Sequence, residues 1–244
     1  MQSNKENAVK TFLLSLALLS PLTLAQECDI DSQYVQANYR VTSQADEAKA
    51  SQTQLFTLWR TPHQVAKQGE QLVEMWQQLR NQQIRPIRYF QKQQRGIEYQ
   101  PAEVQGHQDW HSKYQLISNQ LLAKMTLKSE QMEGCEHQQR YQLQEGDSHI
   151  ELVWLANQKL LKSMQISKPS YQQTITLQSV NFAKQVVLQQ FAIWDRYQTT
   201  DYADIGDNES DPFLAKMINL GFIEHGASGF YNADGKVLQG GHSH

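Results

Sequence analysis

The sequence predicts an α+β, β-rich fold: a curved antiparallel sheet, shaped like half a barrel, with one long packed amphipathic helix and a short C-terminal helix. Three observations predict it. Short apolar and β-branched segments recur at even spacing, with turn residues between them. One central segment changes to the helical period. No internal repeat divides the chain, so its strand–helix–strand order favours one domain, over residues 26–200.

The first 25 residues have the pattern of a secretion signal. Lys5 and Lys10 precede an apolar run over residues 12–24, and Ala25 supplies a small residue at the expected cleavage point. The run is about 13 residues long, shorter than the roughly 20 that span a hydrocarbon core, which disfavours a retained membrane anchor. We therefore expect cleavage after Ala25 and a periplasmic protein.

The two cysteines, Cys28 and Cys135, are an even pair in an oxidising compartment, so we expect one disulfide between them. Closing so long a loop contributes about 4 to 5 kcal/mol in the chain-entropy model. The alternative is two independent thiols. The spacing excludes a CxxC redox or zinc motif, and Glu27 before Cys28 does not fit the small residue that a lipid-modification motif needs.

Roughly nine to eleven strands are predicted, in one series before the helix and one after it. Glu145-Gly146-Asp147-Ser148 is a good hairpin turn between two of the later strands. The predicted strands are residues 39–41, 54–60, 65–67, 71–78, 84–90, 96–101, 138–144, 149–155, 160–166, 171–180 and 185–197.

The predicted long helix covers residues 109–132, with Asp109 as its N-cap and Gly134 as its stop. Its apolar residues recur every three or four positions, which places them on one face that must pack against the sheet. These residues are Trp110, Tyr114, Ile117, Leu121 and Met125.

Residues 201–244 are expected to form an acidic loop, a short helix, a hairpin and a histidine-containing tail. Ser210-Asp211-Pro212 is a strong helix start, because a capping side chain precedes a proline at the first turn. The helix should run over 213–220 and the hairpin over 231–237. His225, together with His242 and His244 in the tail, could hold zinc or copper, since imidazole suits both ions. The alternative is a polar, flexible end.

A secreted meander crossed by one helix and followed by further strands resembles the bacterial lipoprotein-carrier folds of the LolA, LolB and RseB type. The local likeness lies in Leu55-Phe56-Thr57-Leu58-Trp59-Arg60, in Ile150–Leu155 and in Leu160–Ile166. The chain differs from LolA in lacking a clear helix after the signal, and from LolB in lacking a lipid-modified cysteine. The resemblance implies a concave sheet whose apolar face holds an acyl chain or a similar ligand.

Several predicted strands are apolar on both faces, so a single helix cannot cover all of that surface. A second layer of the protein is the simpler cover; a bound hydrophobic ligand is the other. The candidate cavity residues are aromatic and aliphatic: Leu55, Phe56, Trp59, Trp76, Trp154 and Trp194.

The near-neutral charge of −3 does not suggest nucleic acid or an anionic membrane as a partner. No serine nucleophile elbow, HExxH or cysteine nucleophile motif is present, which disfavours a hydrolase. The sequence therefore favours a non-enzymatic periplasmic binding or carrier protein for a hydrophobic ligand or an envelope protein. Divalent-metal binding by the C-terminal histidines is the alternative.

Overall fold

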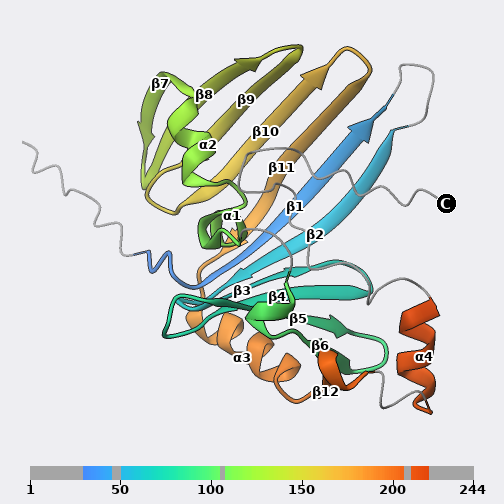
Figure 1. The fold of residues 1–244 in the computed structure, drawn as a ribbon. Helices are drawn as coiled ribbons and strands as arrows, with labels where there is room; N and C mark the ends of the chain where they lie inside the picture. Colours follow the sequence, from blue (N-terminus) through green and yellow to red (C-terminus); the bar gives the residue numbers. More distant parts are fainter. Residues whose placement is uncertain (1–29, 46–50, 105–107, 206–209, 220–244) are drawn as a thin grey trace, which may run out of the picture.

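A computed structural model describes residues 30–45, 51–104, 108–205 and 210–219. In these residues the strands form one curved sheet of 12 strands in the order β12-β6-β5-β4-β3-β2-β1-β11-β10-β9-β8-β7 (Figure 1). Every neighbouring pair is antiparallel except β12 with β6, which is parallel. The predicted α+β class with a curved, open, half-barrel sheet is confirmed.

The first six strands form a meander. They are β1 (Val35–Gln44), β2 (Gln52–Arg60), β3 (Gln64–Gln68), β4 (Leu72–Gln78), β5 (Ile84–Phe90) and β6 (Arg95–Glu98). A second meander runs back to the centre of the sheet, where β11 pairs with β1. It comprises β7 (Thr126–Glu133), β8 (Glu136–Glu145), β9 (Ser148–Leu155), β10 (Leu160–Lys168) and β11 (Tyr171–Asn181), and β12 (Gln198–Asp201) follows later.

The helices are short and connect or cover the strands. They are η1 (Pro101–Glu103), α1 (Trp110–Gln115), α2 (Asn119–Lys124), α3 (Lys184–Trp194), η2 (Tyr202–Asp204) and α4 (Pro212–Asn219). No helix among the described residues is long and apolar enough to cross a membrane.

The β8–β9 hairpin confirms the turn predicted at residues 145–148. Glu145 pairs with Ser148, which leaves a two-residue loop of Gly146 and Asp147. Gly146 has a φ of +56°, in the left-handed region that glycine adopts without steric cost.

The prediction of one continuous helix over residues 109–132 is wrong. Asp109 does cap α1, through a bond from the His111 N–H to its Oδ1. However, Leu116 has a φ of +66° and ends α1, and the Ser118 hydroxyl caps a new helix, α2. After α2 the apolar period is lost and the chain becomes β7, which pairs with β8.

The predicted apolar stripe of that segment is nevertheless confirmed, since α1, α2 and the residues that join them pack it against the sheet. Ile117, Leu121 and Met125 belong to the main core cluster, and Trp110 and Tyr114 pack against it. Leu116, with its left-handed backbone conformation, turns the chain between α1 and α2. The apolar side chains of the stripe stay on the side that faces the sheet.

The prediction of a strand over residues 185–197 is also wrong, because this segment is α3. Val187, Phe191 and Trp194 follow one another at intervals of four and three, which is the helical period, and all three are buried. A strand would place Ile193 on the same side as the buried Phe191, but Ile193 is 42% exposed. The helix covers a second apolar cluster on the opposite face of the sheet.

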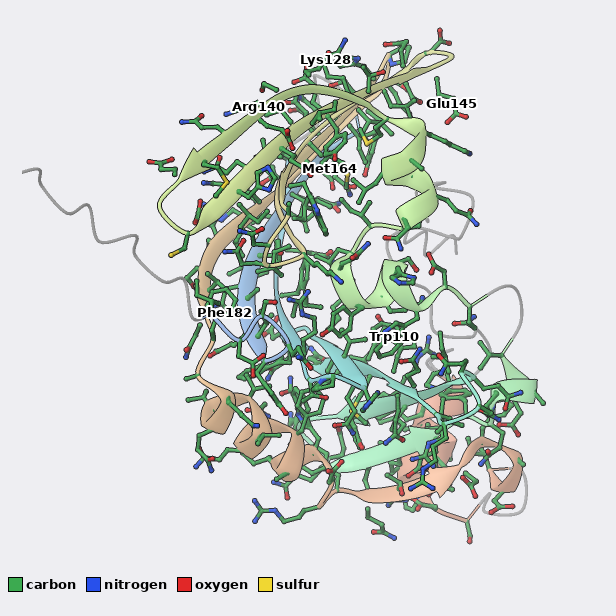
Figure 2. The ribbon with its side chains drawn as sticks, turned by 90° about the vertical axis from the view of Figure 1, so that its left-hand side faces the viewer. Trp110, Lys128, Arg140, Glu145, Met164 and Phe182 are labelled. Atoms are coloured by element: carbon green, nitrogen blue, oxygen red, sulfur yellow. The ribbon has the colours of Figure 1, made fainter. Side chains whose placement is uncertain are left out.

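The sheet therefore has three covered regions. Figures 1 and 2 show α1 and α2 inside the curve of the sheet, with α3 outside it beneath β3–β5. The inner cluster includes Met164, which is buried in the interior of this curve. A third cluster joins α4 to the far end of the sheet, where Leu214 and Met217 meet Phe90 and Ile97.

The predicted start of the C-terminal helix is confirmed. The Asp211 carboxylate accepts the Phe213 N–H at 2.8 Å and thereby caps α4. The same carboxylate pairs with Arg95 at 2.9 Å, which ties α4 to β6. The sheet also extends past the expected domain boundary at residue 200, because β12 ends at Asp201. The predicted hairpin over 231–237 lies outside the described residues.

Arg60, at the end of β2, is fully buried and connects three distant parts of the chain. Its Nη1 donates to the carbonyls of Tyr114 at 3.3 Å and Lys159 at 2.8 Å. Its Nη2 donates to the carbonyls of Ser32 at 2.8 Å and Gln158 at 2.7 Å. One planar guanidinium thus holds the entry to β1, the end of α1 and the β9–β10 turn together.

We expect Arg60→Leu to lower the free energy of unfolding by about 3 kcal/mol or more, because buried carbonyls lose their donors. Arg60→Lys should recover little, since an ammonium cannot reach all four carbonyls. Urea denaturation followed by tryptophan fluorescence measures both. Arg140→Leu, at an exposed position on β8, is the control. Equal stability of the Arg60 and Arg140 variants would contradict this account.

Candidate functional site: a groove where the sheet divides

The sheet divides between β2 and β3. These strands pair through Thr57–Arg60 of β2 only, whereas β1 pairs with β2 through Ser43↔Gln52 to Val35↔Arg60. The first half of β2, residues 52–56, therefore has β1 as its strand neighbour and diverges from β3 (Figure 1). A gap opens between this half of β2 and the β3–β4 turn.

A groove of about 1010 Å³ occupies that gap. It is open to the surface, and its walls come from β1, β2, the β3–β4 hairpin and β11. The lining residues are Asn38, Tyr39, Arg40, Thr53, Gln54, Leu55, Phe56, Thr57, Lys67, Gln68, Gly69, Glu70, Leu72, Glu74 and Gln178.

The apolar part of the groove is an aromatic stack beside an exposed leucine. Tyr39 and Phe56, directly opposite each other on β1 and β2, stack with ring centroids 5.1 Å apart and planes at 12°. Both are buried, and the Tyr39 hydroxyl is fixed by a 2.9 Å bond to the Leu161 carbonyl. The Leu55 side chain is 64% exposed. The floor is therefore rigid, and its rim presents apolar surface to solvent.

The polar part is a row of charges that crosses three strands on the inner face. Lys67 lies opposite Glu74, and Glu74 lies opposite Arg88. The Arg88 Nη2 is 3.7 Å from the Glu74 Oε1. The Lys67 Nζ lies 5.2 Å from the centre of the Phe56 ring, in a cation–π contact. One carboxylate is thus shared by cations on both sides, next to the aromatic floor.

Lys113, on α1, adds a further cation above this row. Its side chain is almost fully buried, and its Nζ lies 4.8 Å from the centre of the Trp76 ring. Burial lowers the pKa of Lys113, while the charges of Glu74 and Asp109 act in the opposite direction.

Burial also lowers the pKa of Lys67 from its usual 10.5 to about 8. The neighbouring Lys113 charge adds to the lowering, and the Glu74 carboxylate opposes it. Lys67 is therefore a cation at pH 7 that is held in a poorly solvated place.

The six sequence-predicted cavity residues are not gathered in one place. Leu55 and Phe56 line the groove. Trp59 and Trp194 pack edge to face with centroids 6.0 Å apart in the α3 cluster, on the outer face. Trp76 and Trp154 are buried in the inner cluster. Trp194 is a helix residue, so its expected place on a strand is corrected; a ligand-binding role for the six stays a prediction.

The sequence reasoning missed Lys67, Glu74, Tyr39 and Leu72 as groove residues. A signal for the first two does exist: Lys67 lies three residues before Glu70 and Glu74 three residues after Gln71, so a hairpin centred on Glu70-Gln71 pairs opposite charges. Nothing local shows that Tyr39 and Leu72 meet the same groove, because their neighbourhood depends on the point where β2 leaves β3.

The other predicted sites lie wholly or partly outside the described residues. This holds for His225, His242, His244 and Cys28, so the metal site and the disulfide stay predictions. Cys135 is described; its carbonyl accepts a bond of 3.1 Å from the Gln158 side chain. In the described part of the chain, no three His, Cys, Asp or Glu side chains are arranged to hold a metal ion.

No family model matches the chain, and no curated protein matches its sequence. Its shape is similar to that of PNGF-II in two crystal forms, with 11% and 12% identity, TM-scores of 0.37 and 0.36, and 72% and 68% of this chain covered. This chain spans about a third of PNGF-II, 32% and 31% of its length.

Two further structures are of the type that the sequence resembles. An outer membrane lipoprotein-sorting protein domain from Vibrio parahaemolyticus is 7% identical, with a TM-score of 0.32, over 67% of this chain and 92% of that one. A LolA superfamily protein from Nitrosomonas europaea is 7% identical, with a TM-score of 0.23, over 65% and 90%. Likenesses this remote carry no argument about ligand or role.

The pKa of Lys67 predicts how stability changes with pH. Between pH 8 and 10.5 the unfolded chain keeps a proton that the folded protein has released, so the free energy of unfolding should rise with pH across this window. We expect Lys67→Met to show a smaller rise than the unchanged protein in urea denaturation at pH 7, 8, 9 and 10. The exposed Lys124→Met is the control. Identical pH slopes for all three proteins would contradict the lowered pKa of Lys67 in its partly buried position.

Proposed function

We propose that this protein is a periplasmic binding or carrier protein that holds a hydrophobic ligand, or an apolar segment of an envelope protein, in the groove between β2 and β3. The observation that carries the proposal is that the stacked rings of Tyr39 and Phe56 and the exposed Leu55, the residue before Phe56 on β2, all line the groove. Apolar surface gathered in a concavity is typical of ligand sites.

The size of the groove and its rigidity support this proposal. Its volume of about 1010 Å³ is at the upper end of small-molecule sites, which run from about 300 to 1,000 Å³. The stack of Tyr39 on Phe56 is already formed, so a ligand does not have to order it on binding. Each Å² of apolar surface that a ligand removes from water contributes about 25 cal/mol before ordering costs.

The chemistry of the lining favours binding over catalysis. The ionisable side chains among the described lining residues are those of Lys, Arg, Glu and Tyr. Serine, cysteine and histidine are not among them, and the Lys67 ammonium lies over the Phe56 ring. An apolar floor with charges at one side suits a ligand that is held and released unchanged.

Replacing Leu55 by Ser should weaken binding of the fluorescent probe N-phenyl-1-naphthylamine about tenfold, because a buried leucine contributes roughly 1.5 to 3 kcal/mol. Met132→Ser is a matched control: Met132 is 63% exposed on β7, at the opposite edge of the sheet from β12. It should leave the affinity unchanged. Both positions are exposed, so folding is preserved, and urea denaturation verifies this.

Equal affinities of the Leu55→Ser and Met132→Ser variants for the probe would contradict binding in the groove. Native mass spectrometry of the protein purified from the periplasm gives an independent reading: the expected result is a co-purifying amphipathic molecule that the Leu55→Ser variant retains less well.

A further inference from the structure

The groove follows the main chain of β2 where this strand leaves β3. The successive residues 53–57 of β2 line one of its walls, and the successive residues 67–70 line another. Phe56 belongs to the inner core cluster, so Leu55, the residue before it, lies on the outer face of the strand. Because residues from both faces of β2 border the groove, the strand edge between those faces borders it too.

The main-chain groups of Thr53 and Leu55 point into the groove. Successive residues of an antiparallel strand direct their N–H and C=O groups alternately to the neighbour on either side. The Thr61 N–H donates to the Gln64 carbonyl at 2.9 Å, in the same register as the β2–β3 pairs, so the odd-numbered residues of β2 bond towards β3. The same alternation directs Thr53 and Leu55 to this side, where β3 no longer pairs with β2, and leaves Gln54 to bond with β1.

These groups of Thr53 and Leu55 have no hydrogen-bond partner among the described residues. The wall opposite is different, because the Gly69 and Glu70 carbonyls both accept from the Gln91 side chain, at 2.9 and 3.1 Å. A strand edge with unpaired donors and acceptors is a template on which another extended chain can add as a strand. The groove therefore offers main-chain hydrogen bonds on its β2 side.

The charges that line the groove balance at pH 7. Arg40 and Lys67 are positive, and Glu70 and Glu74 are negative. The lining thus gives no net attraction to an anion or to a cation. It suits a neutral occupant with main-chain donors and acceptors along one edge and apolar side chains for the apolar part of the groove. An extended, uncharged polypeptide segment has these properties.

We propose that the occupant of the groove is an extended apolar segment of another polypeptide, which pairs with the free edge of β2 as an added strand. Its main chain exchanges hydrogen bonds with Thr53 and Leu55. Its side chains alternate between the two faces, so some pack beside Leu55 on the outer face and the others beside Phe56 on the inner face. This inference rests on the proposed function and names the chemical class of the ligand.

Two peptides with the same side chains test the proposal on the unchanged protein. Both are labelled with fluorescein and have a core of alternating valine and threonine between terminal lysines, and one is N-methylated at every core residue. Fluorescence anisotropy measures both affinities. We expect N-methylation to weaken binding about tenfold, or about 1.4 kcal/mol, because it removes the main-chain donors that pair with β2.

A proline on β2 tests the same pairing from the side of the protein. Thr53→Pro removes an N–H that faces the groove and is not part of the ladder with β1, a position at which a strand tolerates proline. Peptide affinity should fall about threefold or more. Urea denaturation verifies that the variant folds, and the comparison of the two peptides tests the proposal without any variant.

Met132→Pro is the matched control, on the strand β7 at one end of the sheet. Glu133 and Glu136 pair across a two-residue turn, so Glu133 bonds to β8 and the Met132 N–H points away from β8. This edge also carries Lys128 and a bulge between Leu127 and Ser129, and both features hinder the addition of a strand. Met132→Pro should therefore keep the peptide affinity.

The outcomes separate this inference from the proposed function. Equal affinities of the two peptides, or a loss of peptide binding only in Met132→Pro, would overturn strand addition at β2. If N-phenyl-1-naphthylamine still binds, the role of the groove for hydrophobic ligands stays in place. Failure of both the probe and the peptide to bind would overturn the binding role itself.

Discussion

The short junction between β2 and β3 is the constraint on which the rest of this structure depends. Only Thr57–Arg60 of β2 pairs with β3, and that pairing joins the β3–β6 half of the sheet to the half built from β1, β2 and β7–β11. Arg60 ends the junction, and its guanidinium holds four carbonyls from three other segments. Because the junction is short, the strands can separate beyond it. Because Arg60 fixes its closed end, the separation is a defined groove.

The distribution of the apolar core follows from the same division. The inner face is covered by α1 and α2, which lie inside the curve of the sheet, and the outer face of β3–β5 is covered by α3. The protein therefore shields most of its apolar sheet surface with its own helices. The sheet residues that stay exposed include Leu55, beyond the junction, and Met132, on the edge strand β7; of these two, Leu55 lines the groove. The proposed ligand role therefore concerns the groove at Leu55 rather than a whole apolar face of the sheet.

Sequence patterns predict the structure correctly where the residues of a single strand or turn determine it. The strands predicted before residue 101 and those predicted between residues 138 and 180 are present, as are the Gly146 turn and the Asp211 cap. The two failures concern the period of apolar residues. Residues 185–197 are an apolar-rich run that suggests a strand with Val187, Phe191 and Ile193 on one face. However, Val187, Phe191 and Trp194 follow the helical period. In 109–132 the stripe was real, but a left-handed Leu116 and a capping Ser118 divide it.

The candidate site was predicted less well, because it depends on contacts between distant segments. Leu55 and Phe56 are predicted from their apolar character on a strand, and both line the groove. The four tryptophans are predicted on the same grounds, yet they pack in the core, since large aromatic rings bury much apolar area there. The register of β2 against β3 places Lys67 beside Phe56, and no single segment of sequence contains that information.

Photo-crosslinking tests the central claim, that ligand binds where β2 leaves β3, most directly. A palmitate analogue with a diazirine in its chain would be bound to the protein, irradiated and mapped by peptide mass spectrometry. This account predicts labels on Tyr39, Leu55, Phe56 and Leu72, competed by unlabelled palmitate. Labels confined to other parts of the sheet, such as β7 and β8, or labels that palmitate does not compete, would contradict it.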